Sequence, residues 1–443
     1  MNYIVVGTGP VGVVVAEYLL SKNKQVVIID NSQCLNENTR DFTLKKSDRN
    51  IFSGNIYSQD KKTKHLPVSS SAQGGFSEIW GGTFSELDDR DFRDWDISRE
   101  DLFKYYEYLI NLLNLDVNIN NNFKLMSVFD ESDEIFSELF KKSFNKNVEI
   151  QKSKIMKKGS DIWSAKSLLK EVFIKYPNLK YINNFEVTNI TENDNEIILH
   201  SKDQTLKFEN SKVLVCAGVL SSSLIASNIL KNYKFSIQTS DLKVLPIIYF
   251  GKSVKSGKNT FPQAFINFLD RNIKTQLYAV NKNLTASIGS NQSRISSILL
   301  KTISKFLNSR LLLLFIYSNS EQSSYFNFLN DKNKIYLENK VKKNDSSLSY
   351  VFFNMLKQTL KLKLLPIPFF KKFPTYGSFH NGSTKFLENK KYLYKFDELG
   401  KVRNDLNVYF LDSSVFYSVP SGPTTFLSMS YALYKTEKIL DEE

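Results

Sequence analysis

The chain has 443 residues, of which 42% are hydrophobic and 24% charged, and 59 basic against 46 acidic residues give it a formal net charge of +13. This length exceeds one minimal core and predicts two or three domains, or one large discontinuous unit. The excess charge reflects either a lysine-rich composition or an anionic partner. Because the lysines are scattered, the first interpretation is favoured, and without a known binding module we expect no nucleic-acid partner.

Sulfur and imidazole groups are scarce in this sequence. The two cysteines, Cys34 and Cys216, and the three histidines have neither metal-site spacing nor the pattern of a disulfide framework. We therefore expect no metal centre and a reducing compartment, which favours a cytoplasmic protein. No secretory signal opens the chain, and the longest apolar run, LLLLFI at 311–316, is too short to cross a bilayer.

The N-terminal stretch, MNYIVVGTGPVGVVVAEYLLSKNKQVVIID, has the pattern of a phosphate-binding βαβ unit. An apolar strand leads into Gly7, Gly9 and Gly12, and a helical stretch and a second apolar strand follow, ending on Asp30. Gly7 allows a tight turn, Gly9 lets the backbone approach a pyrophosphate, and Gly12 lets helix and strand pack closely. The order of these elements predicts dinucleotide binding, with Asp30 accepting hydrogen bonds from ribose hydroxyls. An acid at this place argues against NADP and leaves FAD and NAD open.

A second glycine cluster lies at 69–87, SSSAQGGFSEIWGGTFSEL. Paired glycines permit close approach of the backbone to a flat or charged ligand. A helix is expected shortly after this cluster, with Ser98 and Asp101 as its capping pair. Its apolar side chains recur at helical spacing and predict an ordinary core contact, made by Leu102, Tyr105, Tyr106, Leu109 and Leu113.

Three blocks of the chain together resemble one enzyme family. GGFSEIWGG, followed by W-x-I-S-x-x-D-L-x-x-Y-Y, resembles the flavin-adjacent segment of the glucose–methanol–choline oxidoreductases, in the bacterial branch that has G-G-x-S-x-x-W-G-G. The block at 184–224 ends in an apolar strand and the residues CAG, which resembles the strand that closes the FAD domain. The block at 402–433 resembles the C-terminal signature, with a strand, D-x-S, a small-residue loop and a flavin-facing helix. The resemblance covers roughly residues 1–110, 155–230 and 376–440.

The resemblance implies an α/β protein (α+β overall), with a Rossmann-like FAD-binding domain and an antiparallel-sheet substrate domain. It implies FAD-binding segments at 1–115, 155–235 and 376–443, a linker or helical insertion at 116–154, and a substrate domain at 236–375. FAD would be bound by residues of the glycine clusters and the strand ends, which are Gly7, Gly9, Pro10, Gly12, Asp30, Gly74, Gly75, Ser77, Trp80, Gly81, Gly82, Val187, Ala217, Gly218, Asp412, Ser413, Pro423, Thr424 and Thr425.

His380, in GSFHNGST, loosely matches the family block H-x-x-G-[TG], which places a histidine beside the flavin. The resemblance implies that it is the catalytic base, because an imidazole can take a hydroxyl proton near neutral pH, or else the group that orients the substrate hydroxyl. The family's second His or Asn is absent, since its position is Gly422; Ser421, Thr424 and Tyr376 are candidates to replace it. Of the other histidines, His200 is expected to be exposed in a hairpin strand. His65 is expected in a loop. If FAD is covalently attached, His65 is the expected attachment residue.

The middle segment, 236–375, has no glycine-rich motif. Its apolar stretches predict strands, among them LKVLPIIYF, KTQLYAV, LLLFIYSN and KIYLEN. A basic amphipathic helix is expected at 294–310, where packing on a sheet is favoured over contact with an anionic bilayer. A second apolar and basic stretch lies at 352–373. Because these two stretches are both apolar and basic, peripheral contact of the protein with the inner face of a membrane stays open as an alternative.

These patterns favour an FAD-dependent oxidoreductase that acts on a CH–OH group. The expected substrate is an alcohol, with a sugar or a sugar derivative favoured and a lipid- or nucleotide-linked form left open. The sequence does not identify the electron acceptor. Two alternatives are an FAD-dependent epimerase or isomerase without net redox change, and a flavin-binding protein without catalysis, the latter suggested by Gly422.

Overall fold

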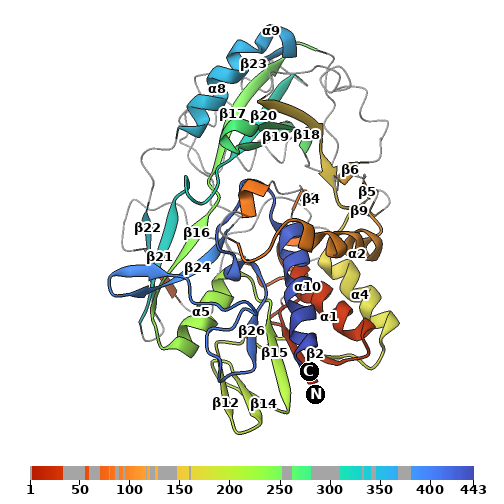
Figure 1. The fold of residues 1–443 in the computed structure, drawn as a ribbon, viewed down its shortest axis with the longest axis vertical. Helices are drawn as coiled ribbons and strands as arrows, with labels where there is room; N and C mark the ends of the chain where they lie inside the picture. Colours follow the sequence, from red (N-terminus) through yellow and green to blue (C-terminus); the bar gives the residue numbers. More distant parts are fainter. Residues whose placement is uncertain are drawn as a thin grey trace.

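The computed structural model shows two regions, one above the other in Figure 1. The lower region holds both chain ends, a parallel sheet and most of the helices, and the upper region holds an antiparallel sheet with helices α8 and α9 beyond it. The described residues are 2–32, 55–58, 70–78, 80–84, 89–92, 95–115, 117–119, 125–127, 147–158, 161–251, 262–280, 310–331, 334–340, 346–367 and 381–443.

A five-stranded parallel sheet forms the base of the lower region, in the order β11-β2-β1-β15-β26. Its strands are short, largely buried apolar runs, as expected where helices cover a parallel sheet. The chain passes from β1 outward to β2 and β11 and then returns to the other side of β1 with β15, which confirms the predicted Rossmann-like topology. The strands are β1 (Asn2–Val6), β2 (Gln25–Ile29), β11 (Lys180–Ile182), β15 (Ser211–Val215) and β26 (Val408–Phe410).

Helices α1 and α10 lie side by side and run in the same direction (Figure 1). The hydroxyl of Tyr18, near the end of α1, donates to Glu437, near the end of α10, at 3.2 Å. Because β1 leads directly into α1, both helices begin at the carboxyl end of the parallel strands. The helices of this region are α1 (Pro10–Ser21), α2 (Phe103–Leu113), α4 (Ala165–Lys175), α5 (Val219–Leu230) and α10 (Thr425–Asp441).

The capping pair predicted before α2 is confirmed. The backbone N–H and the hydroxyl of Ser98 donate to the Asp101 carboxylate at 2.9 and 2.7 Å, and the N–H of Asp101 donates back to Ser98 at 3.3 Å. These bonds stabilise the short 3₁₀ helix η4 (Glu100–Leu102), which runs into α2. All five apolar residues of the predicted stripe are buried, so this helix packs as expected.

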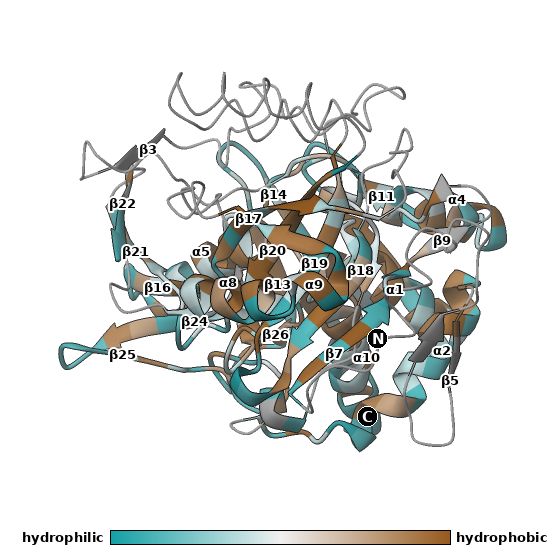
Figure 2. Ribbon diagram, turned by 90° about the horizontal axis from the view of Figure 1, so that it is seen from above, coloured by the Kyte–Doolittle hydropathy of each residue, from teal (hydrophilic) through white to brown (hydrophobic). Residues whose placement is uncertain are grey.

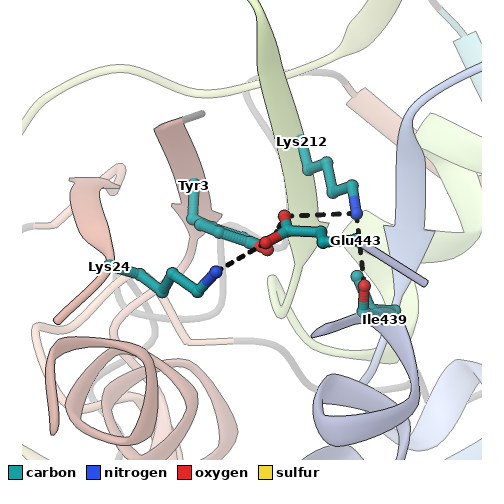
Figure 3. A network of polar contacts seen from close by, with 5 residues as sticks. All are labelled: Tyr3, Lys24, Lys212, Ile439 and Glu443. Carbon is teal, nitrogen blue, oxygen red and sulfur yellow. Dashed lines mark hydrogen bonds and ion pairs between the residues drawn. The ribbon is translucent and has the colours of Figure 1, made fainter. Parts of the chain in front are cut away.

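The last residue of the chain is bound to the first strand (Figure 3). The Glu443 carboxylate accepts a hydrogen bond from the Tyr3 hydroxyl, pairs with Lys24 at 2.5 Å and lies 3.4 Å from the ammonium of Lys212. Lys212 also donates to the carbonyl of Ile439 at 3.2 Å. Burial raises the pKa of Glu443, but the bonds from Lys24 and Tyr3 and the charge of Lys212 outweigh it and lower that pKa to about 2. The carboxylate therefore joins α10 to β1 and β15.

Two further sheets flank the parallel sheet, and both are antiparallel except for the parallel pairing of β22 with β3. The first is a three-stranded meander, β12-β13-β14, and the second is a six-stranded sheet in the order β25-β24-β16-β21-β22-β3, which we call the lateral sheet. One face of the lateral sheet shares the main core, where Phe235 and Phe328 stack with ring centroids 4.9 Å apart. The strands are β12 (Asn189–Asn193), β13 (Glu196–His200), β14 (Thr205–Glu209), β3 (Asn55–Ser58), β16 (Lys234–Thr239), β21 (Tyr325–Asp331), β22 (Lys334–Lys340), β24 (Asn381–Glu388) and β25 (Lys391–Leu393).

The upper region is built on a second six-stranded sheet, β23-β17-β20-β19-β18-β7, which we call the distal sheet. Helices α8 and α9 cover one face of it and form a separate core with it, to which Leu277, Leu314, Val351 and Met355 contribute. The elements are β7 (Val148–Lys152), β17 (Leu242–Tyr249), β18 (Pro262–Phe268), β19 (Lys274–Ala279), β20 (Leu311–Tyr317), β23 (Leu364–Pro366), η6 (Leu269–Arg271), α8 (Ser347–Lys357) and α9 (Thr359–Leu362).

The strands predicted in the middle segment are confirmed as β17, β19, β20 and β22. The expected linker 116–154 contributes β5 (Val117–Ile119), β6 (Leu125–Ser127) and β7 among its described residues. The basic helix expected at 294–310 lies outside the described residues except for Arg310, and His65, Tyr376 and His380 also lie outside them. Within the described ranges, no helix is long and apolar enough to span a bilayer.

Candidate active site

The first glycine loop lies at the carboxyl end of β1, where the winding of the sheet reverses. Gly7 has φ +107°, and a Cβ there would lie 2.5 Å from the carbonyl oxygen of Cys216, at the end of β15. A Cβ at Gly12 would lie 2.0 Å from the carbonyl oxygen of Gly7. Gly9 differs, because nothing lies within 4 Å of the Cβ it lacks. Gly7 and Gly12 therefore allow close packing, whereas Gly9 faces open space.

A second open position lies at the carboxyl end of the neighbouring strand β15, across the switch point between β1 and β15, which is where doubly wound folds have their ligand crevice. Gly218 follows β15 and Ala217 and is the N-cap of α5, with φ +82° and no atom within 4 Å of a Cβ built on it. The second glycine cluster approaches the first, since a Cβ on Gly75 would lie 3.3 Å from the Cα of Gly9. Backbone N–H groups at the starts of α1 and α5 thus border open space, which is the arrangement that binds phosphate in doubly wound folds.

Asp30 ends β2 beside this crevice. Its Oδ2 accepts hydrogen bonds from the backbone N–H of Thr8 at 2.6 Å and from the Thr8 hydroxyl at 2.8 Å. Burial raises the pKa of Asp30 to about 6, although both Thr8 bonds oppose the rise. Among the described residues Oδ1 has no hydrogen-bond partner, so it is available to accept from a ligand hydroxyl.

Asp412 lies at the end of β26 and is buried. Its Oδ2 accepts from the Gly218 N–H at 2.8 Å and the Ser222 hydroxyl at 2.5 Å, and its Oδ1 accepts from the Ser414 N–H at 2.9 Å. Burial raises the pKa of Asp412, against these bonds. Because Asp412 already has three protein donors, the contacts support a positioning role: it fixes the first turn of α5 against Ser413 and the 3₁₀ helix η8 (Ser413–Val415).

Several residues of the second glycine cluster hold the cluster in place. The Ser77 hydroxyl donates to the Gly74 carbonyl at 2.6 Å and accepts from the first N–H of α4 at 2.8 Å. The Trp80 indole donates to the carbonyl of Trp163 at 3.0 Å. Gly82 has φ +64°, and a Cβ there would lie 2.5 Å from the side chain of Ile162. The described contacts of these residues are with the protein itself. Gly81 is half-buried nearby, and Val187 is buried after β11.

Helix α10 begins beside this cluster. Phe84, in β4 (Thr83–Phe84), packs against Phe426 with ring centroids 4.9 Å apart. Thr424 precedes the helix, and its carbonyl accepts from the N–H and the hydroxyl of Ser428 at 2.8 and 2.9 Å. The Thr424 hydroxyl has no partner among the described residues. The helix start therefore keeps donor groups of Thr424 and Thr425 free for a ligand, whereas Pro423 before them has no N–H.

The loop that leads into α10 is tied to the connections between the lateral and distal sheets. Ser320 donates its N–H to the Val419 carbonyl at 2.8 Å, and its hydroxyl accepts from the Val419 N–H at 2.9 Å. The Ser421 hydroxyl donates to the Asn272 carbonyl at 2.9 Å. Gly422 has φ +100°, a conformation that strains any residue with a side chain. The missing second His or Asn thus coincides with a backbone that requires glycine, and Ser421 is already engaged.

Strand β24 brings the residues after His380 to this loop. A Cβ on Gly382 would lie 2.8 Å from the carbonyl oxygen of Ser413, and the Ser383 hydroxyl donates to the Tyr417 carbonyl at 2.9 Å. His380 itself is outside the described residues, so its role stays a prediction. His200 lies in a strand as predicted, but it is half-buried and its Nε2 is 2.8 Å from the Thr191 hydroxyl.

The distal sheet carries a polar strip that was not predicted from the sequence. Lys274, Gln276 and Tyr278 alternate along β19 with the residues that pack under α8, so they face the lower region. Gln276 is 2% exposed; its Oε1 accepts from the hydroxyls of Tyr278 at 2.7 Å and Tyr317 at 3.2 Å. These two bonds fix the amide, and its Nε2 has no partner among the described residues. The alternation in KTQLYA was the available signal for this strip.

A buried ion pair closes the strip at one end. The Lys274 ammonium lies 3.1 Å from Asp91 Oδ2, and the Asn272 amide donates to Asp91 Oδ1 at 2.7 Å. Asp91 belongs to η3 (Asp89–Phe92), in the lower region. Since the Asn272 carbonyl also accepts from Ser421, this group joins the distal sheet to the loop before α10.

Comparison with known proteins supports the fold. The sequence matches no family model and no curated protein. Among solved structures, the chain is similar to pyridoxine 4-oxidase from Mesorbium loti, with a TM-score of 0.70, 11% sequence identity, and coverage of 100% of this chain and 99% of that one. The chain therefore has the fold of that enzyme over its whole length, which confirms the predicted fold class.

Proposed function

We propose that this chain is an FAD-dependent oxidoreductase of the glucose–methanol–choline type that oxidises an alcohol. One observation carries the proposal: Gly9 and Gly218 face open space on the two sides of the crevice where the sheet reverses its winding, at the starts of α1 and α5. The fold match supports it, because pyridoxine 4-oxidase is an oxidoreductase of that family.

The residues of the crevice fit FAD. The N–H groups at the start of α1 would bind the pyrophosphate, and the free oxygen of Asp30 would accept from a ribose hydroxyl. The unpaired donors at the start of α10 would face the flavin edge that becomes negative on reduction. When bound, FAD would supply the acceptor for the hydride that an alcohol carbon loses.

The residue that precedes β24 would accept the substrate proton. His380 directly precedes Asn381 in the chain, and β24 lies against the loop that leads into α10. We propose that the His380 imidazole takes the hydroxyl proton of the substrate. Because Gly422 carries no side chain and Ser421 is engaged, the Thr424 hydroxyl is our candidate for the second polar group.

The proposed substrate is a neutral alcohol with further polar groups, such as a sugar or a sugar derivative. The free Nε2 of Gln276 would donate to an acceptor oxygen of such a molecule. Pyridoxine, the compound in the name of the structural neighbour, is also a polar alcohol with several acceptors.

The cofactor is tested by the colour of the purified protein. We expect flavin absorption that releases FAD on denaturation. Gly9 has φ −64° and ψ 176°, which any residue adopts, and nothing lies within 4 Å of a Cβ there, so we expect Gly9→Val to fold while filling the space for the pyrophosphate. We expect Gly9→Val to be colourless, with only the small loss of stability of a weaker helix N-cap, and Gly9→Ala to retain part of the FAD. A colourless wild-type protein that also fails to bind added FAD would refute the proposal.

The reaction is tested by anaerobic mixing with a panel of alcohols. Bleaching of the flavin supports oxidation, and His380→Ala is expected to slow bleaching by about a hundredfold or more with FAD retained. Persistent colour with every alcohol would instead support the non-catalytic flavoprotein that Gly422 suggests. Turnover without consumption of an electron acceptor would support an epimerase.

A further inference from the structure

A cluster of exposed apolar side chains covers the outer end of the upper region. Eight large hydrophobic residues are exposed among the described residues, and four of them gather here, so chance scattering does not explain the group. We call this group, with its neighbouring lysines, the α8–α9 patch. Its apolar members are Phe250 (54% exposed), Phe353 (55%), Leu356 (45%) and Leu360 (96%).

Helix geometry places these side chains together. Val351, Met355 and Leu362 point into the core beneath the helices, and Phe353, Leu356 and Leu360 follow the opposite face at helical spacing. Phe250 joins them because its N–H donates to the Lys363 carbonyl, just after α9, at 2.8 Å. Figure 1 shows α8 and α9 at the end of the molecule opposite both chain ends, and in Figure 2 they lie over the strands of the distal sheet.

The two helices themselves carry only positive charge. Residues 346–367 contain three lysines and no acidic residue. Each lysine is exposed; they are Lys357, Lys361 and Lys363. The patch therefore combines an apolar surface with cations at its edge, which is the composition that binds the headgroup region of an anionic bilayer.

Two other occupants suit this composition less well. Lysine is depleted in protein–protein interfaces, where its desolvation is costly. A second copy of the chain would meet the patch across a two-fold axis and bring like charges together. A bilayer with anionic headgroups satisfies the apolar residues and the lysines at once.

We propose that the α8–α9 patch docks this protein reversibly onto membranes that contain anionic lipids. Phe250, Phe353, Leu356 and Leu360 enter the boundary between headgroups and acyl chains, and the lysines pair with lipid phosphates and carboxylates. This inference is independent of the proposed enzymatic function.

Flotation of the full-length protein with lipid vesicles tests the proposal. We expect binding to vesicles of phosphatidylcholine with phosphatidylserine, weaker binding in high salt, and little binding to phosphatidylcholine alone. The variant Leu360→Ser with Lys357→Glu changes only exposed side chains, so its melting temperature should equal that of the wild type. Its partition coefficient should fall about tenfold or more.

A matched control exists on α4. Ile174 is 82% exposed and lies four residues after the exposed Lys170, in a helix far from the patch. The variant Ile174→Ser with Lys170→Glu makes the same chemical changes and should leave binding within about twofold of the wild type. Absence of flotation, equal losses in both variants, or a concentration-dependent dimer that the patch variant abolishes would each overturn the proposal.

Discussion

The parallel sheet and the distal sheet make their proposed contributions to the site in opposite ways. At the parallel sheet, the candidate ligand contacts are backbone groups and one carboxylate at strand ends, next to glycines that stand in short motifs. At the distal sheet, they are side chains in the middle of strands, such as Gln276 in β19. Backbone contacts require glycine at fixed spacing and so leave a trace in the sequence. Side-chain contacts on one face of a strand leave only an alternation.

Two valine substitutions should separate packing from ligand binding at the parallel sheet. A Cβ at Gly12 would lie 2.0 Å from the Gly7 carbonyl oxygen, so Gly12→Val should cost on the order of 4 kcal/mol or yield no folded protein. Gly9→Val should cost no more than about 1 kcal/mol, because its Cβ enters open space and only a helix N-cap is weakened. Denaturant unfolding measures both, and a stable Gly12→Val protein would contradict the assignment.

Breaking the buried ion pair between the two regions should cause the next largest loss in the free energy of unfolding. The side chains of Asp91 and Lys274 are 1% and 11% exposed, so Asp91→Asn leaves a buried ammonium without its counterion and should cost about 3 kcal/mol. The control is Glu196→Gln, which breaks an exposed pair with Lys207 at 2.8 Å and should cost less than about 1 kcal/mol. Equal losses in urea unfolding would show that Asp91 does not join the regions.

Substitution of Gln276 should affect the substrate and not the cofactor. Gln276→Leu removes the free amide donor at similar volume, so KM should rise about tenfold while the flavin content is unchanged. Gln276→Glu keeps an acceptor for the two tyrosine hydroxyls but also lacks the donor, so a loss shared by both variants is due to the donor. Loss of FAD in either variant would show that Gln276 contributes to binding of the cofactor and not of the substrate.

The pH dependence of FAD affinity should report on Asp30. Its pKa is raised to about 6 in the free protein, so the folded state binds the extra proton and the free energy of unfolding should fall as pH rises from about 4 to about 6. A ribose hydroxyl that donates to the carboxylate favours the charged form. FAD affinity should therefore rise by up to about tenfold per pH unit up to about pH 6 and then level off.

The control for this pH effect is Asp30→Asn, which should bind FAD more weakly and with no dependence on pH in that range. Titration calorimetry at several pH values measures both proteins. If FAD affinity depends on pH in Asp30→Asn as it does in the wild type, the proton that is released belongs to another group.

The features that were predicted correctly from the sequence are those that local spacing and periodicity determine. The βαβ unit, the capping pair of α2 and the strands of the middle segment follow from spacing and periodicity, and the structure contains each of them. Two of the three donors of Asp412 could not be predicted, because Gly218 and Ser222 lie 194 and 190 residues away in sequence and meet it only in the folded protein. Gln276 was missed for a similar reason, since the face that it presents depends on where α8 packs.

The Glu443 contact has a consequence for how the protein is made. The side chain of residue 443 bonds to that of residue 3, and the last strand of the parallel sheet, β26, comes from residues 408–410. Residues as far as 443 must therefore have left the ribosome before the parallel sheet and the contact between Glu443 and Tyr3 can both form. During synthesis, β1 and β15 expose apolar surface without their final partners, so the nascent chain is expected to need chaperones and to refold slowly in vitro.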